Sequence, residues 1–206
     1  MIDNEEKLKS INNYLNNYFD KWLFNDIDLM ERHELKFTLP YILLIFSGID
    51  FLSILKFGIT KATNKESNPS VRSKHFITSY MYEATKNETY KDEDIARFLY
   101  EHVRNGAVHY SMYKDSVSCS SDLVVYPKEA HLHIDPGDNN KDFIIIQIQK
   151  FIEDFKLAYE YFKINYIEKN IDDVFNKLNE MLGDKKNYDI NAINFLKSKG
   201  TVTDSV

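Results

Sequence analysis

The sequence predicts an all-α fold, a helical bundle with a small β-hairpin inserted in it, and three observations support this prediction. Only 6 Gly and 4 Pro stand among the 206 residues, so few positions interrupt a helix or make the turns of a β-sandwich. Hydrophobic residues make up 43% of the chain, which is enough for a buried core. Apolar residues recur every three or four positions, which is the period of an amphipathic helix. The length fits a single domain, residues 1–206.

Four helices are expected in the first half of the chain, over residues 4–24, 37–57, 74–85 and from 93 to 109 or beyond. The first carries a single apolar stripe, whereas the second is apolar on most sides, as the central helix of a bundle is. Gly58 suits the end of the second helix, and Asp92 suits the N-cap of the fourth. Between the second and third helices, residues 65–73 are expected to form a polar loop.

The pattern then changes from helical to β-like. Residues 123–126 and 131–134 are short β-like runs, and residues 135–138 are a strong turn signal. We therefore expect a hairpin insertion over about residues 120–136.

Helical periodicity returns over residues 143–182, with a break near Asn170 that favours two helices over one. Gly183 is expected to close this section. A last short helix is expected over residues 191–199, and the tail, residues 200–206, is expected to be flexible.

Charge, cysteine content and hydropathy limit the classes of function. The net charge of −6 means that any contact with nucleic acid must come from a local patch. The single cysteine, Cys119, excludes a disulfide or a four-cysteine zinc site within one chain. Residues 39–55 approach the length of a membrane span, but a carboxylate such as Asp50 at that depth costs about 2.5–3.5 kcal/mol. Residues 1–10 lack an apolar signal segment. We expect a cytoplasmic protein with no membrane partner, and a tether through residues 39–55 is the alternative.

The segment that carries chemistry lies on the fourth helix. At about 100° per residue, His102, Asn105 and His109 share one flank of that helix, beside its apolar stripe. Arg104 projects from the opposite side if the helix is straight. Taken singly, each of these residues also fits a structural role, as a core-edge histidine, a surface ion-pairing arginine or a polar flank residue. Together they form a polar cluster beside the core, and such a cluster needs partners.

Residues 104–109, Arg-Asn-Gly-Ala-Val-His, resemble the signature of the HEPN domain family, which is Arg, a polar residue and His after a short gap. The resemblance covers about residues 37–182, and it is to the bacterial members. It implies an antiparallel helical bundle and a metal-independent endoribonuclease that needs no cofactor. It also implies that Arg104, Asn105 and His109 are the catalytic residues. Such proteins are usually dimers in which both motif copies face one cleft, and they often serve as toxins or in defence against phage.

Two comparisons within the sequence bear on this motif. Arg97 and His102 have the same spacing, but Phe98 follows Arg97 where the motif has a polar residue. In the HEPN subgroup that pairs with a nucleotidyltransferase, a Tyr stands two positions after the motif His, whereas Ser111 stands there in this chain. The sequence therefore neither requires nor excludes a cognate antitoxin as a partner.

RNA cleavage suits the chemistry of these side chains. RNA carries its own nucleophile, the 2′-hydroxyl. His109 is expected to act as general base or acid, Arg104 to bind the phosphate in the transition state, and Asn105 to orient the imidazole or bind the phosphate. Two symmetry-related copies of His109 would supply both an acid and a base, which predicts an isologous homodimer. A partner helix or a kink near Gly106 would bring Arg104 and His109 to one phosphate.

His102 and Asp50 are supporting candidates. His102 either joins the site or is structural. Asp50 is the only acidic residue of the apolar second helix. It pairs with Arg104, orients a histidine of the motif, or closes a polar pocket that has no chemistry, and the sequence leaves these interpretations open.

A weaker candidate and a rival function complete the prediction. His131 and His133 share a predicted strand face and could bind a metal with Cys119 or Asp135, but without a firm third ligand their exposure or packing in the hairpin is favoured. The rival function is a non-catalytic helical module that dimerises or binds a nucleotide or a protein.

Overall fold

The computed structural model describes residues 2–33, 38–58, 68–110, 116–136 and 141–198. The first half of the chain holds α1 (Asn4–Leu15), the π-helix η1 (Asn16–Leu23), α2 (Phe24–Arg32), α3 (Thr38–Phe57), α4 (Pro69–Phe76), the π-helix η3 (Ile77–Met81) and α5 (Tyr82–Thr85). Next come the 3-10 helix η4 (Glu88–Lys91), α6 (Glu93–Phe98), the π-helix η5 (Leu99–Arg104), α7 (Asn105–Tyr110), β1 (Val117–Ser120), the 3-10 helix η6 (Lys128–Ala130), β2 (Ile134–Pro136) and β3 (Asp142–Gln147). The described chain ends with α8 (Ile148–Phe162), the π-helix η8 (Lys163–Ile167) and α9 (Ile171–Ser198).

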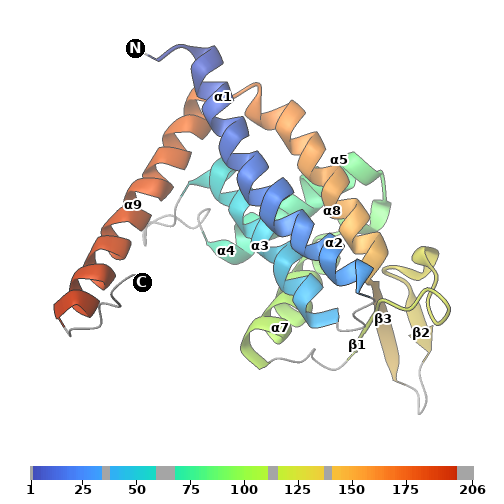
Figure 1. The fold of residues 1–206 in the computed structure, drawn as a ribbon. Helices are drawn as coiled ribbons and strands as arrows, with labels where there is room; N and C mark the ends of the chain where they lie inside the picture. Colours follow the sequence, from blue (N-terminus) through green and yellow to red (C-terminus); the bar gives the residue numbers. More distant parts are fainter. Residues whose placement is uncertain (1, 34–37, 59–67, 111–115, 137–140, 199–206) are drawn as a thin grey trace.

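The helices pack around α3, and the small sheet lies to one side of them. Figure 1 shows α1, α3 and α8 in the centre, the sheet near the start of α8, and α9 diverging from the other helices. The first part of α9 packs on the core, since Val174 and Leu178 are buried. The mostly helical fold with a small β insertion is thus confirmed in its coarse form.

The first helix is longer than expected. α1, η1 and α2 follow one another without a break as far as Arg32, whereas the sequence pattern predicted an end near residue 24. Ile11, Phe19 and Ile27 are fully buried, so the apolar stripe continues past the expected end and keeps this helix on the core.

Two expected helix boundaries are confirmed. Gly58 has a φ of +82°, a conformation that glycine adopts without strain, and it follows the last residue of α3. The Asp92 carboxylate accepts hydrogen bonds from the N–H groups of Asp94 and Ile95 (2.8 and 3.0 Å), which makes it the N-cap of α6.

The expected loop over residues 65–73 is wrong for its second part. α4 begins at Pro69, because the Asn68 side chain accepts a hydrogen bond from the N–H of Ser70 (2.9 Å) and proline suits the first position of a helix. Residues 65–67 lie outside the described part of the chain.

The strands lie elsewhere than expected. Central strand β3 pairs in parallel with β1 and antiparallel with β2, so the insertion over residues 120–136 is not a simple hairpin. Residues 123–126 form a turn instead of a strand, because the Asp122 carboxylate accepts hydrogen bonds from the N–H groups two and three positions later (2.8 and 3.4 Å). β2 starts at Ile134, the last residue of the second expected strand. The expected turn over residues 135–138 is described only as far as Pro136.

The helices at the end of the chain also differ from the prediction. Residues 143–147 belong to β3, because the β-branched run of three isoleucines favours a strand and the Gln147 side chain caps α8 by accepting from the N–H of Lys150 (2.9 Å). The predicted break near Asn170 is confirmed. α9 then continues through Gly183 to Ser198, since one glycine inside a helix costs only about 1 kcal/mol. The tail over residues 200–206 lies outside the described part.

The core is rich in aromatic side chains. Its largest fully buried side chains include Tyr90, Tyr159, Phe19, Phe46, Phe76, Phe151, Phe155 and Phe162. α3 and α8 approach closely at Gly48, where an added Cβ would lie 2.4 Å from the Phe155 ring. A side chain at this position would therefore push the two helices apart.

α3 is the helix in the described ranges that is long and apolar enough to cross a membrane, by length and composition alone. However, 56% of its most apolar window is buried inside the protein. A core helix of a soluble protein passes the same test, so this burial favours a core helix over the membrane-tether alternative.

Candidate functional site

The motif helix, residues 93–110, is built from α6, η5 and α7. Its inner face is buried, with Leu99, Val103 and Ala107 of the predicted apolar stripe and the neighbouring Ala96 all 2% exposed or less. This burial fixes the rotation of the helix on the core and directs its other residues outward.

A π-helical turn lies directly before the motif asparagine. The N–H of Asn105 bonds to the carbonyl of Tyr100, five positions earlier, so this turn is one residue wider than an α-helical turn. The side-chain directions that were predicted from 100° per residue therefore do not apply to this turn. Arg104 Nη1 donates a hydrogen bond to Asn105 Oδ1 (3.1 Å). The expectation that Arg104 points away from Asn105 is wrong, and the two side chains form one polar unit.

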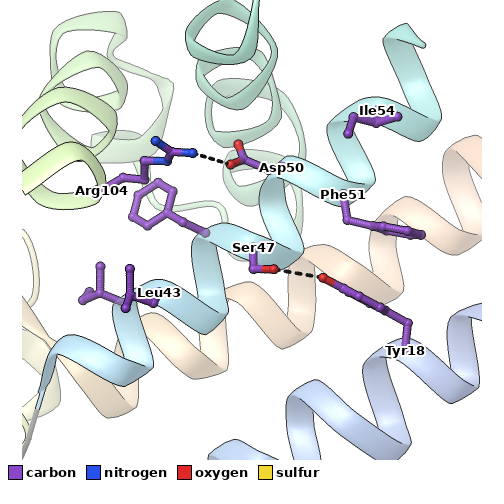
Figure 2. A pocket seen from close by; sticks show the side chains of 9 residues that line it. Tyr18, Leu43, Ser47, Asp50, Phe51, Ile54 and Arg104 are labelled. Atoms are coloured by element: carbon purple, nitrogen blue, oxygen red, sulfur yellow. Dashed lines mark hydrogen bonds and ion pairs between the residues drawn. The ribbon is translucent and has the colours of Figure 1, made fainter. Parts of the chain in front are cut away.

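Asp50 of α3 anchors this unit. Arg104 Nη2 donates to Asp50 Oδ2 (3.1 Å), and the Ser73 hydroxyl donates to Asp50 Oδ1 (2.6 Å). Figure 2 shows the guanidinium of Arg104 directed at this carboxylate. The structure thus favours the interpretation in which Asp50 pairs with Arg104. We call Asp50, Ser73, Arg104 and Asn105 the groove cluster.

The groove cluster is only partly covered. The side chains of Arg104 and Asp50 are 22% and 24% exposed, so the ion pair is shielded from bulk water without being enclosed. The Arg104 guanidinium also lies over the Tyr100 ring, 5.2 Å from its centroid. These contacts hold a long, flexible side chain in one orientation before any ligand binds.

The negative charge of Asp50 also acts on a second arginine, Arg72. Arg72 is 4% exposed, and its Nη1 donates to the carbonyl of Gly58 (3.3 Å). Burial lowers the pKa of Arg72, and the negative charge of Asp50 counteracts this effect. Burial raises the pKa of the Tyr100 hydroxyl, while the positive charge of Arg104 lowers it. One carboxylate therefore compensates two guanidinium groups at the edge of the core.

A groove of about 370 Å³ opens beside Arg104. Its lining residues are Tyr18, Ile42, Leu43, Phe46, Ser47, Asp50, Phe51, Ile54 and Arg104. Figure 2 shows that α3 forms the floor, with Arg104 on one side and Tyr18 on the other. Most of the lining is apolar, and the polar groups come from four of these residues. This composition is typical of a pocket that takes a small molecule or part of a larger ligand.

Arg104 retains the capacity to bind an anion in this groove. A guanidinium has five N–H donors, and the hydrogen bonds to Asp50 and Asn105 use two of them. The remaining donors suit the oxygens of a phosphate, which an arginine can bind in a bidentate geometry. The arrangement can therefore hold a phosphate group at one end of the groove.

The structure brings together some of the predicted site residues and not others. Arg104, Asn105 and Asp50 are in direct contact. His109 lies in α7, one turn after Asn105, and its side chain is outside the described part, so its contact with the cluster stays a prediction. His102 stacks on Phe98 (5.2 Å between ring centroids), and within the described residues its buried Nδ1 has no hydrogen-bond partner. His102 is thus placed for packing and not for chemistry at Arg104.

Sequence reasoning missed several residues of this region. Asp50 was already a candidate, but Ser47, one turn before it on the same apolar helix, was missed, although this spacing was a usable signal for a polar groove on α3. Ser73 and Tyr18 gave no such signal, because Ser73 was assigned to a loop and Tyr18 to the apolar stripe of the first helix. Only the packing of the helices places these two side chains beside Asp50 and Ser47.

The second polar cluster lies where the sheet meets α8. His131 is 4% exposed, and both ring nitrogens are in use: Nδ1 accepts from the N–H of Gln147 (3.2 Å), and Nε2 bonds to the Tyr90 hydroxyl (2.8 Å). Tyr90 donates to Asp154 Oδ2 (2.9 Å), and Lys150 donates to Asp154 Oδ1 (2.5 Å). We call these five residues the enclosed network.

The sequence left open whether His131 and His133 bind a metal or have only a structural role, and the enclosed network bears on this choice. His131 is packed against the bundle, and His133 is exposed to solvent. Among the residues that the structure describes, no three His, Cys, Asp or Glu side chains gather in a way that could hold a metal ion. The favoured interpretation, packing of His131 and exposure of His133, agrees with this arrangement.

Comparisons of the chain with protein-family models, with curated proteins and with solved structures find no match.

Proposed function

We propose that this protein is a metal-independent endoribonuclease of the HEPN type that acts as a homodimer in the cytoplasm. The observation that carries the proposal is the position of Arg104. Its guanidinium is held at the edge of a groove by Asp50 and Asn105, on the helix that also carries His109. An oriented cation beside an open groove is what the stabilisation of a phosphate transition state requires.

The proposed roles follow from the chemistry of each group. Arg104 binds the scissile phosphate and stabilises the charge that develops on its oxygens. His109 removes the proton of the 2′-hydroxyl or protonates the leaving 5′-oxygen. Asn105 and Asp50 are positioning residues, because their contacts orient the guanidinium. The attack of the 2′-oxygen forms a new P–O bond and breaks the P–O5′ bond, which leaves a 2′,3′-cyclic phosphate and a 5′-hydroxyl.

An apolar surface next to the groove supports the homodimer. A second hollow of about 440 Å³ lies beside Pro40, Leu43 and Leu44 of α3 and Leu29 and Met30 of α2, with Asp26 as its charged residue. Leu29 and Leu43 are 42% and 38% exposed, so this surface keeps apolar side chains in contact with water in the single chain. We propose that a second copy covers this surface and that the two motif helices meet in the dimer, as the composite site requires. A toxin or a phage-defence effector is the proposed biological role, and a cognate antitoxin is a further possible partner under the same proposal.

One observation favours the rival function, a non-catalytic helical module. The ion pair between Arg104 and Asp50 stabilises the contact between α3 and the motif helix, and this role needs no substrate. In that case Arg104 would be a structural residue, and the groove would bind a ligand without cleaving it. The two functions differ in whether RNA is cut.

The test is the incubation of purified protein with total RNA in EDTA, followed by analysis of the product ends. The wild type is expected to produce 2′,3′-cyclic phosphate ends without a metal. His109→Ala is expected to lower the rate by about 10²–10⁴-fold, the usual contribution of a general acid or base, and to keep the helical circular-dichroism spectrum. Arg97→Ala is the matched control, because Arg97 lies on the same helix, pairs with Asp94 and is exposed. Equal rates for His109→Ala and the wild type would contradict the proposal.

A further inference from the structure

The groove has an aromatic side that the cleavage chemistry does not use. Across α3 from Arg104, the Tyr18 ring stacks on Phe51 with their centroids 4.6 Å apart and their planes 17° apart. Tyr14 stacks on the same Phe51 at 5.8 Å, but it does not line the groove. Phe51 is only 7% exposed, so it fixes the partly exposed Tyr18 ring from behind, and Tyr18 forms the aromatic wall of the groove.

The floor between these two sides carries a pair of hydroxyl groups. The Tyr18 hydroxyl and the Ser47 hydroxyl are 2.9 Å apart, and either can be the donor. Their mutual bond uses one O–H, so the pair still offers one donor and several acceptor positions to a ligand. Figure 2 shows this bond in the middle of the groove, between the aromatic wall and Asp50. A polar ligand edge that reaches this point finds both a donor and an acceptor.

These groups match one chemical class of ligand. A nucleotide joins an anionic phosphate to a flat aromatic base that has a polar edge, and the groove offers a cation, an aromatic wall and a hydroxyl pair to these three parts. The volume of about 370 Å³ lies at the lower end of the range of small-molecule pockets, so it admits a single base and not a duplex.

We infer that this groove is a nucleobase subsite of the nuclease. Arg104 binds a phosphate, and one base of single-stranded RNA lies against the Tyr18 ring with its edge at the hydroxyls of Tyr18 and Ser47. The inference rests on the proposed function, since it assigns the groove to the RNA strand that is cut. It adds that the enzyme selects its cleavage site by the base that occupies this subsite.

A helix of a second copy fits the groove less well than a base. The groove contains the ion pair of Asp50 and Arg104 and the hydroxyls of Tyr18 and Ser47. An apolar helix that covered these groups would remove them from water without new partners, and this costs free energy. The apolar surface around Leu29 and Leu43 has fewer polar groups and suits a second copy better.

The experiment compares Tyr18→Leu with its matched control Tyr14→Leu. Both tyrosines lie on the first helix, are half-buried and stack on Phe51, and only Tyr18 lines the groove. Cleavage is measured in EDTA on short single-stranded RNAs in which the bases flanking one site are varied in turn. Binding is measured by fluorescence anisotropy with 2′-O-methyl versions of the same oligonucleotides, which lack the nucleophile and cannot be cut by this chemistry.

We expect only the Tyr18→Leu variant, and not Tyr14→Leu, to lose RNA affinity and base preference. Tyr18→Leu should bind the 2′-O-methyl oligonucleotides about tenfold more weakly and lose the preference for one flanking base, whereas Tyr14→Leu should keep both. Ser47→Ala should keep most of the affinity and change the base preference, because it removes only a hydrogen-bonding group. Urea unfolding of the three variants identifies any loss that comes from a destabilised fold.

The failure of this inference can be distinguished from the failure of the proposed function. If the wild type cleaves RNA and the Tyr18 and Tyr14 variants share its rate and base preference, the subsite is wrong and the nuclease stands. If the wild type binds the oligonucleotides in a Tyr18-dependent way but cuts nothing, the nuclease is wrong and the base-binding groove stands. If Tyr18→Leu instead converts a dimer to a monomer in sedimentation, a second copy occupies the groove and the subsite is wrong.

Discussion

Asp50 and Asp154 are both carboxylates on helices of the core, the apolar α3 and the amphipathic α8, yet their surroundings differ. Asp154 is fully buried, and its oxygens accept hydrogen bonds from Tyr90 and Lys150. Asp50 is partly exposed, and its partner Arg104 lines a groove and has N–H donors beyond the two that bond to Asp50 and Asn105. The polar groups of the enclosed network bond to one another, whereas the groove cluster is held together and still lines an open groove.

This difference separates a structural role from a binding role. In the enclosed network, the N–H of Gln147 occupies His131 Nδ1, so the neutral imidazole carries its proton on Nε2 and donates it to the Tyr90 hydroxyl, which donates in turn to Asp154. Such a chain joins the sheet to α8 and to η4. The groove cluster also joins two helices, but its guanidinium keeps free N–H donors that can bind the oxygens of a substrate. Variants in the first region should change stability, and variants in the second should change activity.

The largest expected effect on stability comes from Tyr90→Phe. This change keeps the ring and removes the hydroxyl, so an Asp154 oxygen and the His131 Nε2–H lose their partner inside the protein. The free energy of unfolding should fall by about 2–3 kcal/mol, as measured by urea denaturation. The rate of RNA cleavage by the folded protein should not change.

Tyr159→Phe is the matched control for this prediction. Tyr159 is also buried, but within the described residues its hydroxyl has no hydrogen-bond partner. Its removal should leave the free energy of unfolding unchanged or raise it by up to about 1 kcal/mol. Equal losses in the two variants would show that the enclosed network contributes nothing specific.

In contrast to Tyr90→Phe, Asp50→Asn should affect the cleavage rate more than the stability. The amide keeps the size of the side chain and can still accept one hydrogen bond, but it removes the charge that orients Arg104. The catalytic rate should fall about tenfold because the guanidinium is less well positioned, while the free energy of unfolding should fall by only about 1–2 kcal/mol, since the pair is partly exposed and the amide still accepts a hydrogen bond. A variant that cleaves at the wild-type rate would remove Asp50 from the site and leave it a purely structural residue.

A smaller effect is expected from pH. Burial, together with the positive charges of Lys150 and His133, lowers the pKa of His131 from 6.5 to about 3. Between these two values the unfolded chain binds more protons than the folded protein, so the free energy of unfolding decreases as the pH falls from 6.5 toward 3. Burial raises the pKa of Asp154 above 3.8, which acts in the opposite direction at the acid end of this window.

The pH effect is measured by urea denaturation at pH 7 and pH 5. His131→Gln should be less stable than the wild type at pH 7 and should lose less stability between the two pH values, because it lacks the titrating ring. The other histidines contribute equally to both proteins and cancel in the comparison. The same slope in both proteins would mean that His131 titrates normally and is not enclosed.

The sequence predicted those parts of the fold that depend on local signals. The N-cap at Asp92, the helix end at Gly58 and the break near Asn170 are short-range features, and all three are confirmed. The strands were misplaced because residues 123–126 have the composition of a strand, and only the side-chain turn at Asp122 prevents one from forming.

The groove cluster was only partly predictable for a similar reason. Arg104 and Asn105 came from the motif, and Asp50 came from its isolated charge on an apolar helix. The pairing of Arg104 with Asp50 was one of several alternatives, whereas the bond between Arg104 and Asn105 was not predicted, because Arg104 was expected on the opposite side of a straight helix. Ser73 and Tyr18 depend on contacts between segments distant in the sequence, which no local pattern encodes.

The most direct test of the central claim is the rate at which Arg104→Ala cleaves a short RNA in EDTA, compared with Arg97→Ala. The account predicts a loss of about 10²–10³-fold for Arg104→Ala, the usual contribution of a group that stabilises the charge of a transition state, and no loss for Arg97→Ala. Cleavage by both variants at the wild-type rate would show that the guanidinium held by Asp50 takes no part in the reaction.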